Sequence, residues 1–394
     1  MTPSARIAAA IAVLDARAAG QPAEQALINW ARASRFAGSG DRAAVRDHVF
    51  GVIRRLRSCA ALGGGANGRA LMLGALRDDG IDPAPLFDGA RHHPAPLTEA
   101  ERAHLARAPD LPELVALDCP DWLAPALRAD LGAGFAPVMA ALRHRAPVFL
   151  RVNTARTTRA EARVALAAEG IGAEFMHHIN TALRVTENER KVAGSHAFRS
   201  GLVEVQDAAS QAVVAALPDL AGARVLDYCA GGGGKALAMA AAGACVFAHD
   251  AAPARMVDLP RRAERAGARI ATLTTPTAQA PFDGVLADMP CSGSGAWRRS
   301  PEGKWRLTPD SLAALCTTQA GILDATARLV APGGWLGAAT CSVLRAENDA
   351  QIDGFLARHP DWHCAGRHRW LPGPDGDGFF LALLRAPAAG SERR

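Results

Sequence analysis

The sequence predicts an α/β protein in which a doubly wound, Rossmann-like sheet follows an all-helical region and a small α+β module. Residues 1–140 carry apolar side chains at helical spacing, and residues 141–206 mix short strands with a helix. Over residues 207–386, apolar strands alternate with helices. This alternation is typical of a mostly parallel sheet covered by helices on both faces. The remaining residues, 387–394, are expected to form a disordered tail.

Composition is typical of a globular protein of two or three domains. The 394 residues include 49% hydrophobic and 21% charged side chains, which is enough apolar material for sizeable cores. The net charge of +5 and the isoelectric point of about 8.9 permit a polyanionic partner without requiring one.

Cysteine usage and hydropathy exclude several protein classes. The eight cysteines form no CxxC pair and no Cys/His cluster with zinc spacing, so neither a disulfide framework nor a metal site is expected. Asp15 and Arg17 interrupt the amino-terminal apolar stretch, and the Ala-rich run 236–248 is too short to span a bilayer. We therefore expect a cytoplasmic protein with reduced thiols and no membrane association.

The clearest helix of the first region covers residues 41–56. Its apolar residues recur at helical spacing: Val45, Val49, Val52, Ile53 and Leu56. Arginines crowd the same region, at positions 32, 35, 42, 46, 54, 55 and 57. Such a basic face can hold RNA phosphates, and it is also typical of a solvated helix face. The Pro-rich segment 81–125 predicts short helices and loops.

The second region predicts an α+β module. Its expected strands are 148–152, 182–185 and 202–205, and its expected helix is 158–169. Arg151 and Asn153, at the end of the first strand, are either a nucleic-acid contact or part of an ordinary turn. The third region then predicts four strands, 224–227, 244–248, 285–288 and 335–339, and a helix near 311–330 that stops at Pro332-Gly333-Gly334.

The first candidate site is the glycine-rich turn after strand 224–227. It reads Cys229-Ala230-Gly231-Gly232-Gly233-Gly234-Lys235, and only glycine lets a helix amino terminus come this close to a nucleotide-like cofactor. Asp250 ends the next strand, where a carboxylate can accept hydrogen bonds from ribose hydroxyls. Ala236 after the lysine excludes a Walker loop. The turn fits a nicotinamide cofactor, S-adenosylmethionine, or no ligand at all.

The second candidate site combines two cysteines. The stretch Asp288-Met289-Pro290-Cys291-Ser292-Gly293-Ser294-Gly295 follows one predicted strand, and Thr340-Cys341-Ser342 follows another. Parallel strands of one sheet end at the same edge, where open α/β sheets bind ligands. One cysteine at a strand end is usually a packing residue. Two cysteines, with Asp288 beside one of them, predict thiol chemistry on a substrate that lies against the cofactor.

On these motifs the chain resembles the RsmB-like (Sun/Fmu) family of S-adenosylmethionine-dependent RNA cytosine-5 methyltransferases. The family's D-x-C-A-A-P-G-G-K appears as Asp227 to Lys235, its D-A-P-C-S-G-T-G as Asp288 to Gly295, and its T-C-S as Thr340 to Ser342. Further matches are Arg298-Arg299, Lys304-Trp305, Glu347-Asn348 and the last-strand string ending in Phe379-Phe380. The helical segment containing Asp41-Arg42 resembles the family's NusB-like domain, so the resemblance covers nearly the whole chain.

The resemblance implies methyl transfer to carbon 5 of a cytosine in RNA, most of all ribosomal RNA, by a monomer. Cys341 is then the nucleophile that adds to carbon 6, Asp288 holds the ring nitrogen, and Cys291 removes the carbon-5 proton or releases the enzyme. The cofactor contacts fall to Cys229, Ala230, Gly231, Gly232, Gly233, Gly234, Lys235, Asp250 and Asp288. With one tyrosine in the chain, RNA contacts are expected from arginines and from Trp297 and Trp305.

Two departures from the family pattern affect the cofactor site. The family's Ala-Pro is Gly231-Gly232 here, which gives a looser turn, and no acidic residue ends the third strand, which reads 271–276 as Ala-Thr-Leu-Thr-Thr-Pro. A hydroxyl or a backbone amide is expected to take the place of that acid. Two other classes remain at this point: a nicotinamide-dependent dehydrogenase, and a non-catalytic RNA-binding or assembly factor whose loop has lost the cofactor.

Overall fold

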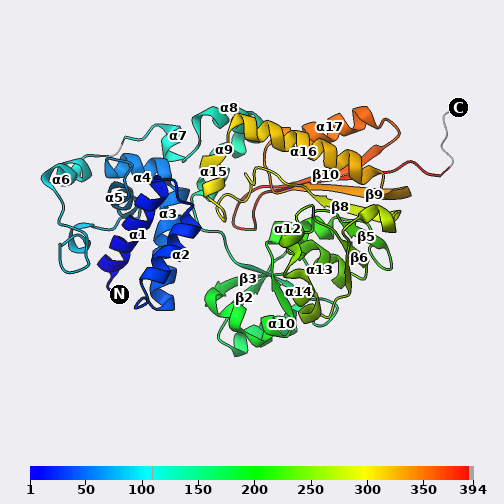
Figure 1. Ribbon diagram of the computed structural model, residues 1–394, viewed down its shortest axis with the longest axis horizontal. Helices are drawn as coiled ribbons and strands as arrows, with labels where there is room; N and C mark the ends of the chain where they lie inside the picture. The colour runs from blue at the N-terminus through cyan, green and yellow to red at the C-terminus, as the bar shows by residue number, and fades with distance from the viewer. Residues whose placement is uncertain (109, 390–394) are drawn as a thin grey trace. The chain divides into compact units, whose positions relative to one another are not determined.

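The computed structural model describes residues 1–108 and 110–389. It divides the chain into two units (Figure 1). The first unit comprises Met1–Arg145 together with Trp297–Arg306, and the second contains the rest. Within the expected tail 387–394, residues 390–394 lie outside the described part of the chain.

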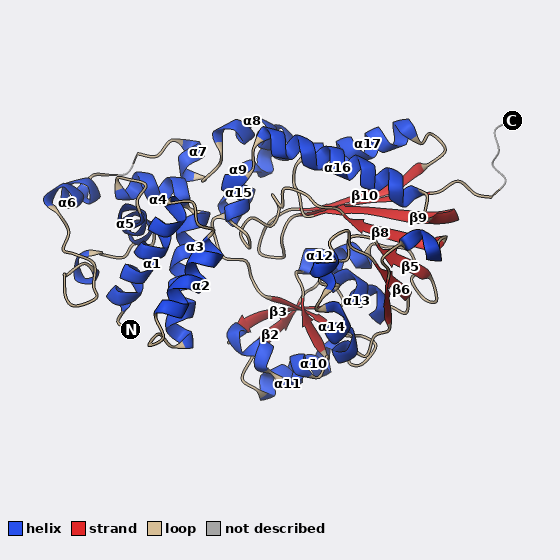
Figure 2. Cartoon of the chain, viewed as in Figure 1, coloured by secondary structure: helices blue, strands red, loops and turns tan. Residues whose placement is uncertain are grey.

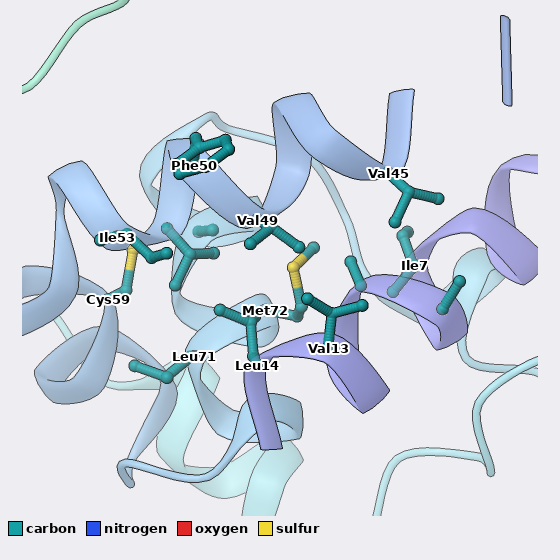
Figure 3. Close-up of a cluster of buried hydrophobic side chains, with 14 of the residues drawn as sticks. Ile7, Val13, Leu14, Val45, Val49, Phe50, Ile53, Cys59, Leu71 and Met72 are labelled. Carbon is teal, nitrogen blue, oxygen red and sulfur yellow. The ribbon is translucent and has the colours of Figure 1, made fainter. Parts of the chain in front are cut away.

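The first unit is helical. Its main helices are α1 (Pro3–Ala18), α2 (Ala23–Ala33), α3 (Ser39–Arg54), α4 (Leu56–Gly63) and α5 (Gly68–Asp78). Figure 3 shows their shared core, where Ile7 and Leu14 of α1 meet Val49 of α3 and Met72 of α5. The Pro-rich segment 81–125 forms short helices, as expected: η1 (Ala84–Leu86), α6 (Glu99–Ala106), α7 (Glu113–Ala116) and η2 (Asp121–Leu123). The chain continues with α8 (Ala124–Leu131), η3 (Gly132–Gly134) and α9 (Phe135–Leu142).

The helix expected over 41–56 is interrupted at Arg55, where α3 ends and α4 begins. The chain segment 297–306, which includes α15 (Glu302–Arg306), explains the break. Trp305 Nε1 donates a hydrogen bond to Ile53 O at 2.7 Å, and Lys304 Nζ donates to Arg54 O at 3.0 Å. The last carbonyls of a helix have no partner within it, so these side chains cap α3.

The second unit begins with the α+β module. Its elements are β1 (Phe149–Val152), α10 (Arg159–Ala168), β2 (Gly172–Phe175), β3 (Ala182–Glu187), η4 (Glu189–Gly194), α11 (His196–Arg199) and β4 (Val203–Val205). The strands pair antiparallel in the order β2-β3-β1-β4. Arg151 and Asn153 are both buried, with Arg151 Nε 2.6 Å from Gln206 Oε1 and Asn153 Nδ2 bonded to two backbone carbonyls. Of the two interpretations of this strand end, the structure favours the turn.

The larger sheet of the second unit has seven strands in the order β10-β11-β9-β8-β5-β6-β7. Five neighbouring strands pair in parallel: β5 (Arg224–Asp227), β6 (Cys245–Ala248), β7 (Ile270–Thr272), β8 (Phe282–Asp288) and β9 (Val330–Thr340). Strand β11 (Phe379–Arg385) pairs antiparallel with β9 on one side and with β10 (His363–Trp370) on the other. This arrangement confirms the α/β fold class. It also places the ends of β5, β6, β8 and β9 at one edge.

Helices cover both faces of this sheet (Figure 2). Helices α12 (Ala208–Ala215), α13 (Gly234–Ala241) and α14 (Leu259–Ala266) lie on one face, and α16 (Pro309–Ala327) and α17 (Asp349–Arg358) lie on the other. Consecutive residues of β8 point to opposite faces of the sheet. Val285 packs in the core beneath α16, and Leu286 packs in the core beneath α12 and α13. Short η5 (Pro253–Met256), η6 (Pro276–Gln279) and η7 (Arg345–Glu347) complete the unit.

One boundary differs from the expectation. The sequence predicts a helix near 311–330 followed by a turn, but α16 ends at Ala327 and β9 already begins at Val330. Phe282 of β8 pairs with Val330, and the next pairing joins Gly284 to Trp335 after a register shift. The Pro-Gly-Gly segment is therefore a bulge inside a strand and not the connection that precedes it.

Two further properties concern ligands and membranes. Among the described residues, no helix is long and apolar enough to cross a membrane. Nor does that part of the chain contain a group of three or more His, Cys, Asp or Glu side chains that could hold a metal ion.

Candidate active site

The glycine turn connects β5 to α13 at the edge where the parallel strands end. Gly231 and Gly233 adopt φ angles of +50° and +80°, a region that residues with a Cβ rarely enter. A Cβ on Gly233 would also lie 2.1 Å from Leu259 Cδ1 of α14. At Gly233 both the backbone angle and the close approach therefore require glycine.

Asp250 follows β6 and binds the glycine turn directly. Its carboxylate is buried, with Oδ2 accepting from Gly231 N at 2.9 Å and Oδ1 accepting from Ala252 N at 2.9 Å. Arg255 NH1 lies 3.0 Å from Oδ2. The structure thus brings together the two features that sequence analysis assigned to one cofactor, and it shows that Asp250 also shapes the turn.

A cavity of about 580 Å³ adjoins Asp250. Its lining includes apolar Met256 and Val257 and the end of β7, Thr272 to Thr274. Asp250 is the one acidic residue that lines it within the described chain. At the end of β7, where the sequence lacks an acid, Thr272 and Thr274 contribute hydroxyl-bearing side chains to the lining. The volume of the cavity is large enough for a nucleoside.

Lys235 and Asp288 connect this turn to the cysteine motif. Lys235, in the first turn of α13, is buried and donates from Nζ to Asp288 Oδ2 at 2.6 Å. Burial alone would lower the pKa of this ammonium group, but the Asp288 carboxylate outweighs it and raises the pKa. Phe379 of β11 lies beneath the same ammonium group, with the ring centroid 5.0 Å from Nζ.

Asp227 is the first residue of the glycine motif and was not among the predicted cofactor contacts. Asp227 ends β5 and is 1% exposed, and neither carboxylate oxygen has a hydrogen-bond partner in the described structure. Burial raises its pKa to about 7; Lys235 opposes this rise, and Asp288 adds to it. An unpartnered buried carboxylate at the end of a central strand is suited to receive a cationic group of a ligand.

Cys291 and Cys341 come together at the same edge. Cys291 follows β8, Cys341 follows β9, and these strands pair in parallel up to Asp288 and Ala339. The two Sγ atoms lie 3.4 Å apart, and both cysteines are free thiols. The hydrogen bond with Cys341, burial and the charge of Cys341 raise the pKa of the Cys291 thiol well above its ordinary value. Two thiols this close together can act on neighbouring atoms of one bound molecule.

Most of the tryptophans and arginines expected to contact RNA bind other residues of the helical unit instead. Trp297 is 2% exposed and Trp305 caps α3, so the expectation that they stack on RNA bases is wrong for Trp297 and unfavourable for Trp305. Arg46 pairs with Glu24, Arg57 pairs with Asp121, and Arg54 Nε donates to Arg298 O at 2.6 Å. In contrast, Arg32 and Arg35 are exposed and precede Phe36, which is 77% exposed.

Two protein-family models match the second part of the chain. The model for the 16S rRNA methyltransferase RsmB/F matches residues 214–385, which include every candidate site residue. The model for the RsmF/B-like ferredoxin-like domain matches residues 119–192. The match therefore begins upstream of the expected module boundary at residue 141.

Curated relatives and a solved structure agree with these models. The chain is 35% identical over 294 residues to the ribosomal RNA small subunit methyltransferase B of Xanthomonas campestris, and the match covers 67% of this chain and 66% of that relative. It is 37% identical over 288 residues to the protein of the same name from Xylella fastidiosa strain 9a5c, covering 67% of this chain and 68% of the relative. The crystal structure of PH0851 aligns with a TM-score of 0.75 at 23% identity, covering 98% of this chain and 99% of that one, and shows the same fold. Because the similarity to the Xylella protein exceeds 30% identity over two thirds of its length, the chain belongs to the RsmB/F family of ribosomal RNA methyltransferases.

Proposed function

We propose that this protein transfers a methyl group from S-adenosylmethionine to carbon 5 of a cytosine in small-subunit ribosomal RNA, through a covalent bond between Cys341 and the base. The observation that carries the proposal is the pair of thiols, 3.4 Å apart, at the sheet edge that also holds the glycine turn. A dehydrogenase has no use for such a pair, and membership of the RsmB/F family also argues against a nicotinamide cofactor.

The need for a nucleophile follows from the chemistry of cytosine. Carbon 5 is a poor nucleophile, but addition of a thiolate to carbon 6 places electron density on it. The raised pKa of Cys291 favours its protonated form, so Cys291 is suited to donate a hydrogen bond and not to attack. Donation from the Cys291 thiol across the 3.4 Å contact supports Cys341 as the attacking sulfur.

The same contact supports a later role for Cys291 as the base. Once the Cys341 sulfur is bonded to carbon 6, it no longer carries a negative charge and no longer accepts from Cys291. Two of the causes that raise the pKa of Cys291 are then removed. Cys291 can then release its proton to water and take the carbon-5 proton, and the electrons of that bond re-form the double bond between carbons 5 and 6 as Cys341 leaves as a thiolate.

Asp288 and Lys235 are positioned to act on the ring nitrogen. Electron density that enters at carbon 6 spreads to N3, and a proton taken up from water and shared between Asp288 and N3 neutralises it until the base is released. Lys235, 2.6 Å from Asp288, keeps positive charge beside this position in a buried environment. The positive charge on Lys235 therefore stabilises the cytosine ring most strongly when negative charge develops on it.

The cofactor site is formed by the glycine turn, Asp227, Asp250 and the adjoining cavity. S-adenosylmethionine supplies an electrophilic methyl group. Asp250 and the threonines that follow β7 suit its ribose and base, and the unpartnered Asp227 carboxylate suits its ammonium group. The substrate base must leave its stack to reach the thiols, so a single-stranded or opened RNA segment is the expected target.

Bisulfite sequencing of ribosomal RNA tests the proposal. A strain lacking the gene should lose a single protected cytosine in small-subunit RNA that its parent carries. Expression of the wild-type protein should restore the protection, and expression of Cys341→Ala should not. An identical bisulfite profile in parent and deletion strains would overturn the assignment and favour a non-catalytic RNA-binding role.

A further inference from the structure

A buried carboxylate binds the residues that follow the two thiols. Glu347, in η7, is 0% exposed. Its Oε1 accepts from Ser292 N at 2.7 Å and from Gln319 Nε2 at 3.2 Å. Its Oε2 accepts from the hydroxyls of Ser292 and Ser342, each at 2.5 Å.

These four bonds join two loops that are distant in sequence. Ser292 is the residue after Cys291, and Ser342 is the residue after Cys341. One carboxylate oxygen, Oε2, therefore holds the neighbours of both thiols at once. Gln319 of α16 strengthens the arrangement because its Nε2 also donates to Pro290 O at 2.9 Å, immediately before Cys291.

The burial of Glu347 points to a role that a smaller contact could not fill. A buried carboxylate is unfavourable unless several donors stabilise it, and here two hydroxyls, an amide and a backbone N–H do so. The two loops are also joined by the backbone bond from Gly295 N to Cys341 O, by a 2.9 Å contact between the Ser294 and Ser342 hydroxyls, and by a longer 3.4 Å contact between the Ser292 and Ser342 hydroxyls. Glu347 adds a charged acceptor that binds Ser292 and Ser342 at shorter distances than their contact with each other.

We propose that Glu347 is a positioning residue that holds the Cys291 and Cys341 loops together so that the two thiols stay within reach of one another. It touches neither substrate nor cofactor, and it acts through Ser292 and Ser342. The value of this placement for catalysis rests on the proposed two-thiol mechanism. The placement itself does not, and it can be measured in the absence of RNA and cofactor.

The direct test measures thiol proximity with phenylarsine oxide. Its arsenic bonds to two neighbouring sulfurs, and its oxygen leaves as water with the two thiol protons. We expect wild-type protein to form a Cys291–Cys341 bridge, identified by mass spectrometry and missing from Cys291→Ala. Glu347→Ala should form this bridge about tenfold more slowly, because the loops separate. The Gln side chain in Glu347→Gln has the same length as Glu and can still form hydrogen bonds with the two serine hydroxyls through its amide group, so this variant should restore most of the rate.

Asp118 offers a matched control in the helical unit. It is also 0% exposed, and it accepts from Arg57 N, from Ser58 N and Oγ, and from Arg143 Nε. Asp118→Ala should lower the melting temperature as Glu347→Ala does and leave the rate of arsenical bridging unchanged. If Glu347→Ala is too unstable to isolate, the double variant Ser292→Ala/Ser342→Ala removes the two hydroxyl bonds to Oε2, the oxygen that joins the loops, and should also slow bridging.

Catalysis supplies the second readout. A displacement of about 1 Å in a reacting group can lower kcat by about 10²-fold, and we expect a loss of that order in Glu347→Ala with the Kd for S-adenosylmethionine unchanged. Wild-type bridging kinetics in folded Glu347→Ala would overturn the positioning role. Slow bridging together with normal methylation would retain the positioning role and instead contradict the two-thiol mechanism.

Discussion

Lys235 Nζ lies 2.6 Å from Asp288 Oδ2, so one ion pair connects the cofactor turn to the cysteine motif. Lys235 lies in the first turn of α13, which follows β5, and Asp288 ends β8, the strand that pairs with β5. The charges of both residues affect the pKa of Asp227: Lys235 lowers it and Asp288 raises it. Two carboxylates thus depend on one buried ammonium group at this edge.

This arrangement predicts a pH dependence of stability that originates in Asp227. The folded chain holds the Asp227 proton up to a pH of about 7, whereas the unfolded chain releases it near the ordinary value of 3.8. Between these values the folded state binds more protons, so its free energy of unfolding falls as the pH rises. The loss is of the order of 4 kcal/mol when complete.

Asp227→Asn should remove this pH dependence. Urea denaturation should show the variant to be more stable than wild type by about 4 kcal/mol at pH 8 and by about 1.6 kcal/mol at pH 5, where the unfolded chain has already released its proton. The same variant should bind S-adenosylmethionine more weakly, since it lacks the charge for a cationic group. Equal pH dependence in the two proteins would show that Asp227 is already ionised in the folded state at pH 5.

Sequence patterns were most informative where local rules determine the structure. Strand ends, the glycine turn and the convergence of Cys291 with Cys341 follow from parallel-sheet topology, and the fold class was predicted from the same patterns. The break at Arg55 could not be predicted, because its cause is a segment some 250 positions later in the chain. The burial of Trp297 has the same origin, since the segment 297–306 belongs to the helical unit.

Side-chain partners were the least predictable property. Seven arginines near α3 suggested a basic face, but several of them pair with acids that are distant in sequence, as Arg57 does with Asp121. Likewise, Glu347 follows Cys341 by six positions and was noted only as part of a motif, whereas its bonds to Ser292 depend on the packing of α16 and η7. Such contacts require the three-dimensional arrangement of elements.

Asp250 provides a test of the cofactor site. Asp250→Ala should weaken S-adenosylmethionine binding by about 1.5–3 kcal/mol, the contribution of hydrogen bonds to a charged group. Isothermal titration calorimetry measures this change. Because Asp250 also binds Gly231 N, part of the loss will come from a less ordered turn. Asp258→Ala, an exposed acid that precedes α14, is the control and should leave the affinity unchanged; equal affinities for both variants would remove Asp250 from the site.

The arginines of the helical unit provide a paired test of RNA binding. Arg32→Gln/Arg35→Gln should weaken binding to ribosomal RNA and reduce the salt slope by about 0.7 for each lost contact with single-stranded phosphate. Arg46→Gln/Arg57→Gln removes the same charge from residues that pair with Glu24 and Asp121, and it should change the slope less. Filter binding over a salt series distinguishes them. An equal decrease in both variants would indicate an effect of net charge and no local contact.

The two cysteines give the most direct test of the mechanism, because they are expected to fail at different steps. Cys341→Ala should abolish methylation and every covalent protein–RNA species, since Cys341 is the thiol that adds to carbon 6 in the proposed mechanism. Cys291→Ala keeps the nucleophile and lacks the base. With RNA and S-adenosylmethionine it should accumulate an adduct that resists denaturant and migrates as a slower band on a denaturing gel.

The double variant separates this mechanism from a purely structural role of the thiols. Cys291→Ala/Cys341→Ala should form no adduct, because the band in Cys291→Ala depends on the Cys341 sulfur. If both thiols only filled space, each single variant would lose some stability, and neither would trap RNA. An adduct in Cys341→Ala and none in Cys291→Ala would exchange the roles of nucleophile and base. That outcome would also reverse the argument from the raised pKa of Cys291, because the protonated thiol would then be the one that attacks.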